Sequence, residues 1–271
     1  MLDPIRQLSF SFDFYRIEKK NLIGANTGAI ATALADYYAG KPLPAGVTIT
    51  PGIPDDNVPG ALPIPQFVSE GFTNLGEETA SGYDIGATAR FTLPYGVKWT
   101  SSFDGNYTLR LNLLEPGQPV QHYAGTIGPY NNVSAGGTPK FKANWANSFA
   151  KGPFTATVVA YYTDGYQLQG EDFGDTTGLC IANGASASNI NTTYLDGITP
   201  VRCKVKPFWD IDTHLTYQAT KHIQLYMDVQ NLFDKQPPID PTTYGANNYN
   251  DVVANAGIYG RTFKFGVKAT F

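Results

Sequence analysis

The sequence predicts an all-β protein, an antiparallel transmembrane β-barrel segment of about eight strands. Three observations lead to this fold class. Apolar and polar residues alternate with a period of two along eight segments, which is the side-chain period of a β-strand. Several segments reach the ~9 to 11 residues that cross a bilayer at a tilt, whereas soluble strands usually have about 5 or 6. The connections between the segments are alternately short and long.

Each predicted strand separates two kinds of side chain. In the first, Leu8, Phe10 and Phe12 lie on one side and Ser9 on the other. The predicted strands span residues 8–17, 79–93, 97–111, 141–149, 154–162, 209–217, 223–231 and 261–271. Aromatic residues gather near strand ends, as the interfacial girdle of a membrane barrel requires.

The connections differ in length in a regular way. The short connections are residues 94–96, 150–153 and 219–222. The long connections are residues 18–78, 112–138, 164–206 and 233–260. Outer-membrane barrels have short periplasmic turns and long extracellular loops, whereas a soluble sandwich has no reason for this asymmetry. Within the first long loop, residues 27–38 predict a short helix with Thr27 as its cap and Gly40 as its stop.

Composition excludes two classes of protein. Charged residues make up only 15% of the chain and aromatic residues 13%. No run of about 18 apolar residues occurs, so a membrane-spanning helix is excluded while a membrane-spanning barrel is not. The net charge is -4 with Lys and Arg scattered, so we expect no nucleic-acid partner.

The end of the chain carries the most specific motif. Residues 231–238 read NLFDKQPP, residues 260–263 read GRTF, and the chain ends on Phe271. This order and spacing resemble the carboxy-terminal signature of TonB-dependent receptors, in which an NLFDK-like segment ends the penultimate strand and a GR-x-F strand closes the barrel. Residues 8–17 and 74–91 resemble earlier strands of the same barrel, so the likeness covers the whole chain.

The resemblance implies a transporter of about 22 strands with a separate amino-terminal plug in its lumen. Such receptors sit in the outer membrane of Gram-negative bacteria and import scarce ligands, such as siderophores, cobalamin or oligosaccharides, with energy passed on by TonB. Residues 1–271 would supply about a third of the barrel and no plug domain, and they show no export signal. We therefore expect a carboxy-terminal fragment or truncated reading frame that is inactive alone. The alternative explanation for the missing export signal is that the signal was removed from a longer precursor.

The expected partners follow from the same resemblance. They are outer-membrane lipid, the remaining barrel strands, the plug, TonB through that plug, and the barrel-assembly machinery. The closing strand and its terminal aromatic would be the assembly signal. The residues expected to carry this signal are Phe263, Phe265 and Phe271.

The polar side of the strands would line a wet lumen, where charges are expected. The residues predicted to line it are Asp84, Arg90, Lys98, Asp104, Arg110, Asp210, Asp212, His214 and Asp228. The spacing of Asp210, Asp212 and His214 puts three possible metal ligands on one strand face. No other His lies nearby in the sequence, so we expect solvated lumen residues, with no metal and no cofactor.

The long loops hold the other candidate residues. Tyrosine among Asn and Gly suits adaptable recognition of a ligand, although anchoring at the membrane interface or loop packing would explain it equally. The candidate ligand contacts are Tyr123, Tyr130, Tyr166, Tyr194, Tyr244 and Tyr249. Cys180 and Cys203 lie in one long loop and predict a disulfide worth about 3 kcal/mol, with two free thiols as the alternative.

No catalytic motif is present, so the sequence predicts a protein that is not an enzyme. Two other interpretations stay open. One is a self-contained eight-stranded outer-membrane barrel whose interior is filled by side chains. The other is a secreted carbohydrate-binding β-sandwich or glycosidase, which would bury the apolar face of its strands.

Overall fold

A computed structural model describes residues 7–25, 27–44, 46–54, 56–74, 76–114, 119–128, 138–168, 180–181, 186, 193, 197–240, 250, 252–253 and 259–270. The chain divides into two compact units. The larger unit comprises residues 1–17, 80–111 and 122–271. The smaller unit comprises residues 18–79 and 112–121.

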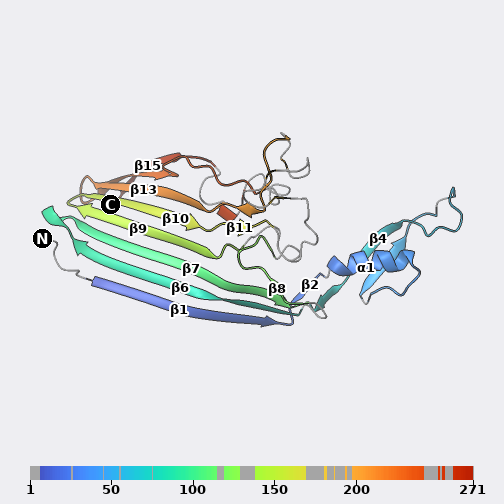
Figure 1. Cartoon of the computed structure of the whole chain (residues 1–271). Helices are drawn as coiled ribbons and strands as arrows, with labels where there is room; N and C mark the ends of the chain where they lie inside the picture. Colours follow the sequence, from blue (N-terminus) through green and yellow to red (C-terminus); the bar gives the residue numbers. More distant parts are fainter. Residues whose placement is uncertain are drawn as a thin grey trace. The chain divides into compact units, whose positions relative to one another are not determined.

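The main sheet contains every strand that the alternation predicts. Its long strands are β1 (Gln7–Lys20), β6 (Glu77–Thr92), β7 (Lys98–Leu114), β9 (Phe141–Lys151), β10 (Phe154–Thr163), β13 (Phe208–Gln218), β14 (Ile223–Gln230) and β15 (Thr262–Ala269). Each strand pairs with the next in this order, and the pairs from β7 to β15 are antiparallel. Figure 1 shows them side by side in a single layer. The predicted eight-stranded antiparallel arrangement is confirmed.

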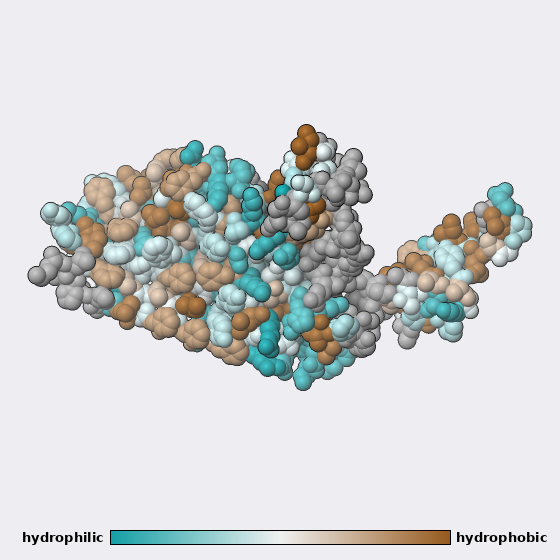
Figure 2. Space-filling view, in the orientation of Figure 1, coloured by the Kyte–Doolittle hydropathy of each residue, from teal (hydrophilic) through white to brown (hydrophobic). Residues whose placement is uncertain are grey.

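One face of the sheet is apolar and uncovered. Phe10 is 69% exposed, Phe154 59% and Phe265 69%. A soluble sandwich packs a second sheet on such a face. The structure places no second layer on it among the described residues, so the sandwich interpretation is wrong. In Figure 2 brown and tan residues cover much of the part that bears the strands, and teal residues gather toward the long loops.

Two polar side chains on this apolar face, Asn147 and Ser101, are hydrogen-bonded. Trp99 Nε1 donates a hydrogen bond to Asn147 Oδ1 at 3.0 Å, and Trp145 Nε1 donates to Ser101 Oγ at 2.8 Å. A polar group in an apolar medium costs free energy unless it is hydrogen-bonded. These indoles therefore let two polar side chains lie on the apolar face.

Aromatic rings also pack across the strands near the short turns. The rings of Phe91 and Trp99 lie 4.9 Å apart, and those of Trp99 and Phe149 lie 5.9 Å apart. Phe154 and Tyr217 stack at 4.6 Å. Offset aromatic pairs of this kind stabilise neighbouring strands.

The short connections lie at one end of the sheet, where β1 also begins and β15 ends (Figure 1). The turn η1 (Pro94–Gly96) places Tyr95 at a φ of 63°, and the next short turn uses Gly152 at a φ of 54°. The long connections leave from the opposite end. The alternation of short turns and long loops is therefore confirmed.

The smaller unit has its own secondary structure. A helix, α1 (Thr27–Tyr38), packs on the hairpin of β3 (Val47–Pro51) and β4 (Pro65–Glu70), while β2 (Ile23–Ala25) pairs with β5 (Phe72–Asn74). Ala33 is fully buried. In the described part of the chain, no helix has both the length and the apolar character needed to cross a membrane.

The helix ends where the sequence predicts. Gly40 has a φ of 64°, its N–H donates to Tyr37 O at 3.1 Å, and Lys41 N–H donates to Asp36 O at 2.8 Å. This is the Schellman arrangement, which favours glycine because that residue adopts a positive φ without strain. The helix also begins at Thr27, as predicted, and the role of this residue as a cap stays a prediction.

Candidate functional site

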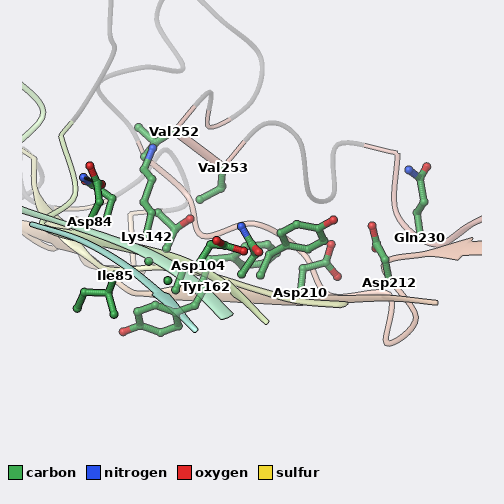
Figure 3. Close-up of a pocket in the computed structure, with 18 of the residues that line it drawn as sticks. Asp84, Ile85, Asp104, Lys142, Tyr162, Asp210, Asp212, Gln230, Val252 and Val253 are labelled. Carbon is green, nitrogen blue, oxygen red and sulfur yellow. Dashed lines mark hydrogen bonds between the residues drawn. The ribbon is translucent and has the colours of Figure 1, made fainter. Parts of the chain in front are cut away.

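The polar face of the sheet encloses one side of a large cavity. Its volume is about 760 Å³. Its main polar lining residues are Asp84, Asp104, Lys142, Tyr161, Asp210 and Asp212. In Figure 3, Asp84, Lys142 and Asp212 rise on the side of the sheet where Val252 and Val253 lie, whereas Ile85 and Tyr162 point the opposite way.

The strand register explains why these side chains meet. Tyr161 pairs with Asp210 across β10 and β13, and Asp104 pairs with Asn144 across β7 and β9. Cross-strand partners face the same side of a sheet, and residues two apart on one strand do so as well, which adds Asp212. Four strands therefore bring their polar residues to one surface.

This surface carries an excess of negative charge. Asp84, Asp104, Asp210 and Asp212 supply four carboxylates, and Lys142 supplies the one ammonium group among the described lining residues. Neutral amides take part too, since Asn106 Nδ2 donates to Asp84 Oδ1 at 2.7 Å. We call this polar surface of the sheet the polar wall. It can accept hydrogen bonds from a ligand or a protein segment that is rich in donors.

Asp210 is the most buried of these carboxylates, at 3% exposed. Its Oδ1 accepts a hydrogen bond from the N–H of Ile211 at 2.7 Å. Lys235, in the loop after β14, lies with Nζ 3.7 Å from the ring centroid of Trp209. Burial lowers the pKa of Lys235, and the carboxylate of Asp210 opposes that shift.

A second, smaller cavity of about 280 Å³ lies beside the first one on the polar wall. It is lined by Asp212, His214, Asp228 and Lys264. His214 Nδ1 hydrogen-bonds Asp228 Oδ1 across β13 and β14. Among the described side chains, no group of three or more His, Cys, Asp or Glu is arranged to hold a metal ion.

The three remaining predicted lumen residues lie toward the ends of the strands. Arg90 donates to Gln7 Oε1 at 2.7 Å near the short turns. Lys98 pairs with Ala150 at the start of β7, and Arg110 lies near the opposite end of that strand. The structure therefore groups Asp84, Asp104, Asp210 and Asp212, with His214 and Asp228 beside them, and separates the three cations from that group.

The long loops of the larger unit are joined by backbone hydrogen bonds. Ile127 N–H donates to Gln167 O at 2.9 Å, and Gln167 N–H donates to Gly125 O at 2.8 Å. The short strand β11 (Tyr166–Gln167) also pairs with β12 (Lys204–Val205). We call the described residues 123–128, 166–168, 180–181, 201–205, 238–240, 250 and 252–253 the loop cap.

The loop cap has a buried core. Its apolar members are Ile127, Tyr166, Leu168 and Val205, each at most 3% exposed. The hydroxyl of Tyr166 lies 2.5 Å from Asp240 Oδ2 and 3.3 Å from Asn250 Oδ1. Both polar partners are buried as well, at 0% and 1% exposed.

This polar cluster also orders the segment beside the wall. Asn250 Oδ1 accepts the N–H of Val252 at 3.1 Å, and Asn250 Nδ2 donates to Pro238 O at 3.1 Å. Val252 and Val253 line the large cavity (Figure 3). The Tyr166 cluster therefore holds an apolar edge next to the polar wall.

The loop tyrosines behave differently from the prediction. Tyr123 and Tyr166, which were candidate ligand contacts, are each 1% exposed, so these two rings are not at the surface and the alternative of loop packing applies to them. Because these loops fold on one another, large rings form the core of the cap instead of its surface. Tyr130, Tyr194, Tyr244 and Tyr249 lie outside the described residues, and so does Phe271.

The predicted disulfide is present. Cys180 and Cys203 are joined at an S–S distance of 2.05 Å across a sequence separation of 23. Cys203 N–H donates to Ile181 O at 3.0 Å, and Leu168 N–H donates to Cys203 O at 2.9 Å. The disulfide therefore joins the loop cap next to its buried core.

The NLFDK segment forms a compact turn at the end of β14. Asn231 Oδ1 accepts the N–H of Lys235 at 2.7 Å, and Asn231 Nδ2 donates to Lys235 O at 2.9 Å. The N–H of Asn231 donates to Asp212 Oδ1 at 2.8 Å. One asparagine therefore fixes both ends of the turn and ties it to β13.

Gly260 and Arg261, at the end of the last long loop, contact this turn. Asp234 Oδ1 accepts the N–H of Arg261 at 2.8 Å, and Arg261 Nη1 donates to Leu232 O at 3.2 Å. Gly260 has a φ of 68°, and a Cβ there would lie 2.8 Å from Asp234 Oδ1. We call Asn231, Asp234, Gly260 and Arg261 the base clasp. Its residues have a structural role in this fold.

Comparison with known proteins agrees with this geometry. The family described as "TonB dependent receptor-like, beta-barrel" matches residues 2–232. The chain belongs to this family. As in other TonB-dependent receptors, it resides in the outer membrane of a Gram-negative bacterium, so its apolar face contacts lipid and its short turns are periplasmic. The matched range ends within the NLFDK segment.

Two solved receptor structures resemble the chain. The siderophore receptor PirA from Acinetobacter baumannii is 15% identical, with a TM-score of 0.50. The ferric enterobactin receptor PfeA from Pseudomonas aeruginosa, solved with enterobactin, is 16% identical, also at 0.50. Each match covers 100% of this chain and 30% of the other. At these identities the likeness shows the fold alone, and no curated protein matches the chain.

Some residues that line the large cavity were not predicted from the sequence. Tyr161 faces the wall, and its place in the alternation of β10, two residues after Val159, could have shown this. Val252 and Val253 carry no such signal, because they reach the cavity through the fold of a long loop. Sequence periodicity therefore finds wall residues on strands and misses those on loops.

Proposed function

We propose that this chain forms part of the wall and extracellular mouth of a TonB-dependent receptor that takes up a scarce ligand. The observation that carries the proposal is the loop cap, whose Val252 and Val253 line a cavity of about 760 Å³ over the polar face of the sheet. A ligand entering from outside would meet the cap first and then the polar wall. Such a mouth suits capture before transport.

The resemblance to siderophore receptors makes a ferric siderophore the first ligand class to test, before cobalamin and oligosaccharides. The family consists of receptors and not of enzymes. We therefore propose no catalytic step and no bound cofactor. TonB and a plug domain in the lumen would supply the energy coupling.

We further propose that other strands complete the barrel and that the chain is inactive alone. The two outer strands, β1 and β15, are not paired with each other among the described residues. The chain also spans about 30% of the length of the solved receptors that it resembles. Unpaired edges in a membrane leave polar backbone groups without partners, which requires further strands.

Barrel assembly is a separate part of the proposal. Phe263 and Phe265 lie on the lipid face of β15, at 58% and 69% exposed. We propose that the barrel-assembly machinery recognises this closing strand together with Phe271. Replacing Phe271 by Ser should reduce the amount of folded receptor in the outer membrane. Unchanged amounts would remove this role from the terminal residue.

Uptake tests the main proposal. Cells that carry the complete receptor should accumulate radioactive iron supplied as a ferric siderophore, and they should lose this uptake when TonB is deleted. Replacing the loop-cap residues Val252 and Val253 by Asp should weaken ligand binding to whole cells, while replacing the exposed Tyr259 should not. Uptake that persists without TonB would contradict the proposal.

A self-contained barrel of eight strands is the second candidate. One observation favours it, since β1 begins and β15 ends at the same end of the sheet and the two could pair antiparallel. Gel migration of the chain refolded in detergent separates the two candidates. A heat-dependent shift would support closure of these strands alone, whereas no shift would support a segment of a larger barrel.

A further inference from the structure

The lipid face carries an apolar groove close to the short turns. Its volume is about 480 Å³. Its apolar lining residues include Phe149, Phe154, Ala156, Leu215, Leu225 and Phe265. They come from β9, β10, β13, β14 and β15. The groove is therefore part of the folded sheet and does not depend on any loop.

A single small residue accounts for the hollow. Ala156 pairs with Phe149 on β9 and with Leu215 on β13, so a methyl group lies between two large side chains. On the periplasmic side, Phe154 and Tyr217 stack at 4.6 Å and form a wall of rings. The result is a hollow among large apolar groups.

One cation stands at the periplasmic end of this groove. Lys151 is the last residue of β9, is exposed, and lines the groove. Its Nζ lies 5.9 Å from the ring centroid of Tyr95, and no carboxylate among the described residues is within 4.0 Å of it. Its ammonium group is therefore available to an anion at the membrane surface.

The other short turns favour the same kind of ligand. Residues 94–96, 150–153 and 219–222 contain Lys151, Lys221 and His222 but no Asp or Glu. A basic surface beside a bilayer attracts anionic lipid head groups. At Lys151 this attraction coincides with an apolar groove, whereas Lys221 does not line the groove.

We propose that this groove binds an anionic glycerophospholipid of the periplasmic leaflet. The head-group phosphate pairs with Lys151, and one acyl chain lies over Ala156 between Phe149 and Leu215. The charge of Lys151 and its place at the periplasmic end of the groove set this lipid apart from lipids that cover the barrel without specificity. The site lies on the face opposite to the polar wall and does not depend on which ligand the receptor imports.

Quenching of tryptophan fluorescence by brominated lipid tests the proposal. Trp99 is the reporter, because its ring lies 5.9 Å from that of Phe149, which lines the groove. A variant with W145F and W209F retains Trp99 as the one tryptophan of residues 1–271. In phosphatidylcholine vesicles, brominated phosphatidylglycerol should quench Trp99 with about fivefold higher affinity than brominated phosphatidylcholine. K151Q should remove this preference.

Two matched controls identify the site. K221Q changes a lysine in a neighbouring periplasmic turn and should leave the preference intact, as should A160F, which lies on the same face of β10 outside the groove. A156F fills the groove and should abolish the preference while the protein still inserts into the vesicles. Equal quenching by the two lipids, or an equal loss with K221Q and K151Q, would overturn the proposal.

Discussion

Single residues on the polar face of the sheet are matched to one another by size. A Cβ on Gly82 would lie 2.5 Å from the hydroxyl oxygen of Tyr15, and one on Gly266 would lie 2.2 Å from Cζ of Tyr226. A tyrosine that lies over a glycine on the neighbouring strand restores packing where the glycine has no side chain. These glycines therefore set where bulky residues of the polar face fit.

Two glycines of β6 allow the effect of overpacking to be distinguished from the loss of backbone flexibility that any glycine substitution causes. A Cβ at Gly82 would also lie 2.4 Å from the backbone oxygen of Tyr107, whereas one at Gly86 would meet the side chain of Ser11. Overpacking against backbone costs about 1–3 kcal/mol. G82A should lower the free energy of unfolding by that amount, and G86A by less, in urea titrations of the protein in vesicles. Equal effects would contradict this explanation.

A second residue-scale prediction concerns the buried hydroxyl of Tyr166. Y166F removes the hydroxyl that hydrogen-bonds the buried Asp240 and Asn250. This should lower the free energy of unfolding by about 1–3 kcal/mol. Hydrogen exchange at the amide of Val252 should become faster, because that amide is held by Asn250. Y259F changes a side chain that is 91% exposed and should have no effect. Unchanged exchange in Y166F would show that the cap does not depend on this hydroxyl.

At the scale of elements, the base clasp joins β14 to β15 across a long loop. D234A removes the acceptor for the N–H of Arg261. It should lower the free energy of unfolding by about 1 kcal/mol and make hydrogen exchange at the amide of Arg261 faster. D234N retains an oxygen acceptor and should restore most of the protection. If D234N behaves like D234A, the effect arises from charge and not from this hydrogen bond.

The disulfide acts on an element as well. Replacing Cys180 and Cys203 by Ser should destabilise the loop by about 3 kcal/mol in the chain-entropy model, because a loop of this length is no longer closed. Limited proteolysis should then cut between residues 164 and 206 while the strands stay intact. Resistance equal to that of the unmodified protein would show that the hydrogen bonds around Cys203 hold the loop without the disulfide.

Strands and loops differed in how well the sequence predicted them. The alternation around Phe10 or Asp212 repeats every second residue, so it places each strand and both of its faces. The burial of Tyr166 depends on Asp240 and Asn250, which come from a loop more than 70 residues further along the chain. No local pattern encodes such a contact, and for this reason the loop cap and its tyrosines were predicted poorly.

For the whole molecule, the central claim is that one sheet separates lipid from a polar lumen. Cysteine substitution along β14 (Ile223–Gln230) tests it most directly, with the receptor in vesicles and a water-soluble thiol reagent added. Residues 224, 226, 228 and 230 should react, while residues 223, 225 and 227 should react only with a thiol reagent dissolved in the bilayer, and residue 229, whose side chain is 4% exposed, should react with neither. Reaction of all eight positions with the water-soluble reagent, or none of this alternation, would contradict the account.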